Sequence, residues 1–79
     1  MQANDGAQRT PTRPAYYNRG GIECLDAIKA AVEPLNGFEG FCVGNAIKYL
    51  WRFPDKGKAQ DLKKAQRYIG WLIEDSEEA

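Results

Sequence analysis

The sequence VGNAIKYLWRFPDKGKAQDLKKAQRYIGWLIED, residues 43–75, contains two helical patterns separated by a turn. In the first pattern, apolar residues recur every three or four positions, as one side of a helix requires: Val43, Ala46, Ile47, Leu50 and Trp51. The second pattern runs from Lys58 to about Asp75 and predicts five inward-facing residues: Leu62, Ala65, Ile69, Leu72 and Ile73. Residues 53–57 combine proline and glycine and predict a turn. So short a connection favours an antiparallel pair of helices.

A third helical pattern precedes this pair. Ile22, Leu25, Ile28 and Val32 recur at helical spacing and predict a helix over residues 22–33, which Pro34 would end. Residues 34–40 are rich in glycine and proline and predict a connection. We therefore expect an all-α domain over residues 15–79, in which this helix packs across the antiparallel pair.

Residues 1–14 have almost no apolar side chains and are expected to form a flexible arm. Deleting them should leave the melting temperature nearly unchanged. The remaining domain is small, and a single core of this size is usually stable only with help from a disulfide, a metal or a partner subunit. Tyr68 and Trp71 add bulk to the last helix beyond its inward stripe, which favours a homo-oligomer.

Composition narrows the possible chemistry. The chain has no histidine and only two cysteines, Cys24 and Cys42, so a zinc site is not expected. We interpret both thiols as small buried residues, although the sequence leaves their redox state open. No apolar run approaches the roughly 20 residues needed to cross a bilayer, so we expect a cytoplasmic protein with no membrane partner.

Charge is unevenly distributed along the chain. The formal net charge is zero, but residues 48–67 carry seven basic and two acidic residues, a local excess of five positive charges. Residues 74–78 carry four acidic residues. The neutral total makes nucleic acid an unexpected partner, whereas the basic segment could bind a smaller anion.

Two polar stripes share the spacing i, i+3, i+7: Asn45, Lys48 and Arg52 on one expected helix, and Asp61, Lys64 and Tyr68 on the next. In an antiparallel pair, the two stripes could line one groove that offers cations to phosphates and an amide or ring to a base or sugar. This combination suits a nucleotide. Alternatively, the basic residues form a solvated helix face, and Asp61 caps its helix or pairs with Lys58 and Lys64.

Other residues allow two interpretations each. Glu23 and Asp26 could act as a catalytic base or hold magnesium with a nucleotide, or could simply favour the start of a helix. Tyr16 and Tyr17 could stack on a ligand or pack the arm. Gly44, beside Asn45, could admit a ligand or allow close helix packing. No P-loop pattern is present.

The ordered blocks of the sequence resemble the small SaV-like phage proteins, a family that includes the P-loop-less nucleotide kinase of a T-odd coliphage. The resemblance spans residues 16–74 and rests on Tyr16-Tyr17, residues 21–28, 44–52, 56–58 and 61–65, Tyr68 and Leu72. It implies a phage origin, helical fold, oligomeric assembly and a nucleotide ligand in the cytoplasm of an infected host. The family's polar signature falls on Glu23, Asp26, Asn45, Lys48, Arg52, Lys58, Asp61, Lys64 and Tyr68.

Three functions follow as hypotheses. The first is nucleotide binding with nucleoside monophosphate kinase activity, and the second is a non-catalytic sponge that sequesters a nucleotide, including a cyclic signal of host immunity. Relatives often have histidine where this chain has Tyr16, a departure that favours binding without catalysis. The third is a helix-turn-helix module that binds nucleic acid or protein.

Overall fold

The computed structural model of the chain describes residues 15–78. Its elements, in order, are η1 (Ala15–Tyr17), β1 (Asn18–Arg19), β2 (Ile22–Glu23), α1 (Cys24–Val32), α2 (Gly37–Arg52) and α3 (Lys58–Glu78). The predicted arm, residues 1–14, lies outside the described residues. The three predicted helices are confirmed, and none of them is long and apolar enough to cross a membrane.

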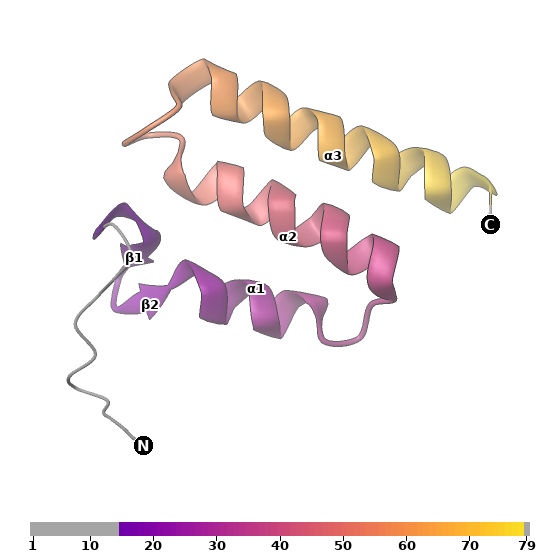
Figure 1. Cartoon of the computed structure of the whole chain (residues 1–79), viewed down its shortest axis with the longest axis horizontal. Coiled ribbons are helices and arrows are strands. Elements are labelled where there is room, and N and C mark those ends of the chain that lie inside the picture. Colours follow the sequence, from indigo (N-terminus) through magenta and orange to yellow (C-terminus); the bar gives the residue numbers. More distant parts are fainter. Residues whose placement is uncertain (1–14, 79) are drawn as a thin grey trace.

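The central helix is α2, which lies between α1 and α3 (Figure 1). The helices α2 and α3 run in opposite directions, as the short turn between them predicts. The prediction that α1 packs across this pair is wrong, because α1 lies along the side of α2 away from α3 (Figure 1). α1 therefore covers neither face of the α2 and α3 pair.

A short hairpin precedes α1 and was not predicted from the sequence. Asn18 pairs with Glu23 and Arg19 with Ile22 in antiparallel register. Gly20 and Gly21 form the turn with φ angles of 61° and 79°, which glycine adopts without steric cost. The helix predicted from residue 22 therefore begins only at Cys24, and Glu23 is its N-cap in extended backbone. Glu23 therefore stands at the N-cap position of α1, and Asp26 lies in its first turn.

The helix α2 begins earlier than predicted. Asn36 accepts a hydrogen bond from the backbone N–H of Glu39 at 2.8 Å, and the Glu39 carboxylate accepts one from the backbone N–H of Asn36 at 3.2 Å. This reciprocal capping box starts a helix at Gly37, inside the segment predicted to be a connection. The real connection between α1 and α2 is only four residues long, 33–36.

The interior of the described domain is built from small side chains. The buried apolar residues are Cys24, Cys42, Ala46 and Ala65. A Cβ placed on Gly44 would lie 3.3 Å from Cγ2 of Ile28 on α1. Gly44 therefore lets α1 and α2 approach closely, which supports the packing interpretation of this glycine over the ligand interpretation.

The predicted inward stripe of α3 is only partly correct. Ala65 is buried and Leu72 half-buried, but Leu62 and Ile69 are each 40% exposed and Ile73 is 53% exposed. Asp61, at 1% exposed, takes the buried position in the first turn. The helix is rotated relative to the predicted stripe because this carboxylate, and not Leu62, faces α2.

Candidate functional site

A buried ion pair fixes α3 against the end of α2. The guanidinium of Arg52 donates to both carboxylate oxygens of Asp61, from Nε at 2.8 Å and from Nη2 at 3.2 Å. The same carboxylate accepts a hydrogen bond from the backbone N–H of Gly57 at 3.1 Å. The predicted pairing of Asp61 with Lys58 or Lys64 is therefore replaced by a bidentate pair with Arg52, and Asp61 also caps the start of its helix.

Arg52 also reaches the segment before α1. Its Nη1 donates to the hydroxyl of Tyr17 at 3.2 Å. The hydrogen bonds that Arg52 donates to Asp61 and Tyr17 raise the pKa of Arg52. The bonds from Arg52 also hold the pKa of Asp61 below its ordinary value despite burial. Arg52 thus joins η1, α2 and α3, and three of its donors are already occupied within the chain.

Three cations surround one aromatic ring beside this ion pair. Lys48 Nζ lies 4.5 Å from the ring centroid of Tyr49, Arg52 Cζ lies 5.1 Å from it, and Lys64 Nζ lies 5.4 Å from it. All three distances fall within the range of cation–π attraction. We call Lys48, Tyr49 and Lys64 the lysine site, because the two ammonium groups form no hydrogen bond or ion pair within residues 15–78.

The lysine site continues into a row of aromatic rings. The ring of Tyr68 stacks on that of Tyr49 with centroids 6.0 Å apart and an interplanar angle of 18°. Phe41 and Trp71 contact Tyr68 edge-on, with centroids at 5.5 and 5.2 Å. Members of the two predicted polar stripes therefore lie side by side: Arg52 bonds Asp61, and Lys64 and Tyr68 both contact the ring of Tyr49.

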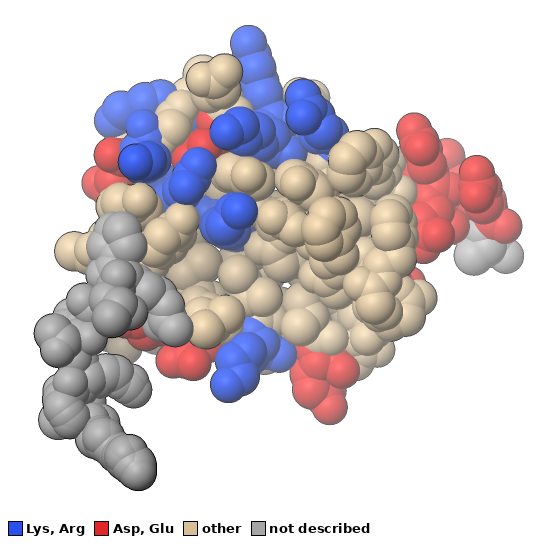
Figure 2. Space-filling view, viewed as in Figure 1, with Lys and Arg blue, Asp and Glu red and all other residues tan. Residues whose placement is uncertain are grey.

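Basic and acidic side chains are separated on the surface, as they are along the sequence. Lysine and arginine side chains gather where α2 ends and α3 begins, and acidic side chains gather at the other end of α3 (Figure 2). Between them lies a stretch of uncharged surface. An anion would therefore be attracted to one end of this face only.

A hollow of about 250 Å³ lies next to the lysine site. Its lining consists of Tyr17, Cys24, Leu25, Ile28 and Lys48. Four of these side chains present mainly apolar or aromatic surface, whereas Lys48 brings a positive charge to the edge. The hollow could accept a flat apolar group whose attached anion remains close to Lys48.

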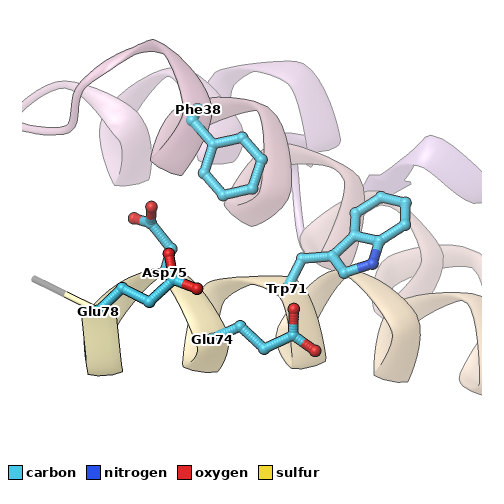
Figure 3. Close-up of a pocket in the computed structure, with 5 residues that line it drawn as sticks. All are labelled: Phe38, Trp71, Glu74, Asp75 and Glu78. Carbon is cyan, nitrogen blue, oxygen red and sulfur yellow. The ribbon is translucent and has the colours of Figure 1, made fainter.

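A larger hollow, of about 420 Å³, lies at the acidic end of the same pair of helices. Phe38 comes from α2 and faces Trp71 on α3, while Glu74, Asp75 and Glu78 follow along α3 (Figure 3). Three carboxylates repel a phosphate group, so this hollow is a poor candidate for an anionic ligand.

Several predicted ligand residues have roles within the chain. The amide of Asn45 donates to the backbone carbonyl of Phe41 at 2.9 Å, and Lys58 Nζ donates to the carbonyl of Pro54 at 2.6 Å. The rings of Tyr16 and Tyr17 contact each other with centroids 4.6 Å apart. Of these four residues, only Tyr17 is brought to the lysine site, through Arg52 and the adjoining hollow.

The predicted catalytic carboxylates are not among the side chains that line the hollow beside Lys48. Glu23 accepts a hydrogen bond from Asn18 at 3.5 Å and Asp26 is exposed in the first turn of α1; neither lines the hollow beside Lys48. Within residues 15–78, no three carboxylate or cysteine side chains are grouped closely enough to hold a metal ion.

Sequence reasoning missed the central ring of the site. The i, i+3, i+7 spacing of Asn45, Lys48 and Arg52 leaves out Tyr49. The useful signal was its position between Lys48 and Arg52, one on each side along a helix, which places both cations next to the ring. The apolar hollow was also missed, because Leu25 and Ile28 were interpreted only as core residues.

Comparison with known proteins gives a family but no characterised relative. No curated protein and no solved structure matches the chain. Residues 11–70 match the family described as protein of unknown function (DUF3310), and the match includes the hairpin, α1, α2 and the first part of α3. The chain therefore belongs to the DUF3310 family.

Proposed function

We propose that the chain binds a nucleotide, with the phosphates held by Lys48 and Lys64 and the base or sugar placed against the adjoining aromatic and apolar surface. The observation that carries this proposal is the lysine site itself: two ammonium groups lie 4.5 and 5.4 Å from one tyrosine ring. Two lysines held this way provide positive charge for a phosphate without first breaking an ion pair.

The sequence suggested that Arg52 binds phosphate, whereas we propose that it positions the surrounding elements. Its bonds to Asp61 and Tyr17 make it a positioning residue, which holds α2, α3 and the wall of the hollow in place. A phosphate would compete with Asp61 for this guanidinium. We therefore assign direct phosphate contact to the two lysines.

Binding without turnover is the form of the proposal that the site favours. A kinase needs groups that position two substrates and neutralise charge during transfer. Glu23 and Asp26 are outside the lining of the hollow that Lys48 borders. The chain is accordingly proposed to sequester its nucleotide, and monophosphate kinase activity is the competing hypothesis.

We also propose that the protein is a homo-oligomer. Nine large apolar residues are exposed among residues 15–78, and the buried core consists of cysteines and alanines. Such a distribution is unusual for a monomer, in which large exposed apolar patches mark binding surfaces. A helix-turn-helix function has less support, since α2 and α3 lie side by side along their length (Figure 1).

The nucleotide proposal is tested by calorimetric titration of the full chain with nucleoside monophosphates, triphosphates and cyclic nucleotides. Lys48→Ala and Lys64→Ala should each weaken binding by about tenfold, because each removes a charge-assisted contact to phosphate. Lys29→Ala is the matched control, since Lys29 is an exposed lysine on α1 outside the site.

Two outcomes contradict parts of this proposal. Equal loss of affinity in Lys29→Ala would mean that binding depends on general charge and not on the lysine site. Conversion of a monophosphate to a diphosphate, measured by mass spectrometry with ATP and magnesium, would replace sequestration with kinase activity. Absence of binding to every nucleotide in the series would overturn the assignment as a whole.

A further inference from the structure

The helix α3 has a second flank that the lysine site does not use. Leu62, Ile69 and Ile73 are exposed along it, and Leu50 of α2 is exposed beside them. A hollow of about 340 Å³ opens on this flank between the two helices, lined by Leu50, Leu62, Lys63, Ala65, Gln66 and Ile69. This apolar surface, which we call the α3 flank, lies on a different side of α3 from Lys64 and Tyr68.

Four exposed charges of α3 are arranged nearly symmetrically about Gly70. Lys63 comes seven residues before Gly70 and Glu77 comes seven residues after it. Arg67 and Glu74 come three residues before and four residues after it. All four side chains are exposed, and none forms an ion pair within residues 15–78.

We propose that two copies of the chain pair through the α3 flank in antiparallel orientation, with the twofold axis passing near Gly70. In that arrangement Lys63 of each copy lies opposite Glu77 of the other, and Arg67 lies opposite Glu74. A parallel pairing would instead place each charge next to its own copy, which is repulsive. Charge complementarity therefore selects both the partner and the orientation.

The apolar residues fit the same register. Antiparallel pairing about Gly70 places Ile73 of one copy opposite Gln66 and Arg67 of the other. Ile73 then lies at the other copy's hollow, which Leu62, Gln66 and Ile69 line. Ile73, at 53% exposed, is the most exposed residue of this stripe. Gly70 allows the two helices to approach at the axis, since a Cβ added there meets no atom of its own chain within 4 Å.

This inference rests on the proposed self-association and not on nucleotide binding. The first test is disulfide trapping of the full chain. Gly70→Cys should form a disulfide-linked dimer under mild oxidation, because a residue beside a twofold axis meets its own copy. Leu62→Cys is the control: in the antiparallel pair its two copies are about 24 Å apart along the helices, from a rise of about 1.5 Å per residue.

The second test exchanges charges. Lys63→Glu should weaken dimerisation measured by analytical ultracentrifugation by about tenfold, because the twofold axis makes each substitution act twice. Adding Glu77→Lys to the same chain should restore it. These residues are 14 positions apart on one helix, so such a rescue can only arise between chains.

The outcomes distinguish self-association in general from the antiparallel register. A dimer that is trapped by Leu62→Cys and not by Gly70→Cys would overturn the antiparallel register while leaving self-association intact. A chain that sediments as a monomer at all concentrations would overturn both. Nucleotide titration of the same samples reports independently on the lysine site.

Discussion

The carboxylate of Asp61 accepts two hydrogen bonds from the guanidinium of Arg52, at 2.8 and 3.2 Å, although Asp61 is only 1% exposed. The pair connects the last residue of α2 to the first turn of α3. A buried charge is tolerated only when its partners are in place. The geometry of the lysine site therefore depends on this ion pair.

We predict that Asp61→Asn destabilises the fold. The substitution keeps the size of the side chain but leaves Arg52 without its counter-ion, and breaking a buried pair in this way typically costs about 3 kcal/mol. Thermal unfolding should show a clear fall in melting temperature. Asp55→Asn is the matched control, because Asp55 pairs with Arg19 at 2.7 Å on the exposed surface; an equal effect in both variants would contradict the special role of Asp61.

The stabilisation that Asp61 contributes to folding should also decrease at acidic pH. The pKa of Asp61 is lower in the folded chain than its ordinary value of 3.8. The ionised carboxylate therefore contributes its full stabilisation above pH 3.8, and this contribution is lost as the pH falls further, through the lowered pKa. The difference in unfolding free energy between wild type and Asp61→Asn should shrink in that range. A difference that stays constant down to pH 2 would contradict the prediction.

Gly57→Ala should be destabilising at a position where the sequence suggests only a turn. A Cβ on Gly57 would clash with the carboxyl group of Asp61. Either the carboxylate or the backbone of the turn must move, so we expect a loss of about 2 kcal/mol. Gly37→Ala, where the added Cβ meets no atom within 4 Å, is the control and should be neutral or stabilising in chemical denaturation.

Asn36→Ala should cost about 1 kcal/mol of unfolding free energy, the usual effect of removing an N-cap. The loss comes from the hydrogen bond that Asn36 accepts from the backbone of Glu39. Hydrogen exchange should become faster in the first turn of α2 while the end of α2 remains protected. Uniformly faster exchange along the helix would mean that the capping box does not act locally.

The helices were predictable because their apolar spacing is regular, but their ends and rotations were not. The start of α2 depends on Asn36 and Glu39 bonding each other, a local signal that the nearby glycines and proline obscured. The rotation of α3 depends on Asp61 being buried, and periodicity alone assigns that position to Leu62. A buried carboxylate is favourable at this position because Arg52 and the backbone N–H of Gly57 both donate to it.

The candidate site, like the helix ends, could be predicted only in part from the sequence. Helical spacing correctly placed Lys48 and Lys64 on neighbouring stripes, but it could not assign the bonds of Arg52, because those depend on the turn at Gly57 and on Tyr17 from a distant segment. The start of α1 could not be predicted from periodicity for a related reason. The glycine hairpin before α1 takes Glu23 out of the helix, and apolar periodicity carries no information on such a turn.

The two buried thiols of the core can report how often the helices separate. Cys24 on α1 and Cys42 on α2 are both free and buried, and burial, followed by the charge of Asp75, raises the pKa of Cys42. An alkylating reagent can therefore reach the Cys42 thiol only when the helices separate. The alkylation rate of the unlabelled native protein would thus measure how often α2 detaches from its neighbours, and ligand or partner binding would register as slower labelling.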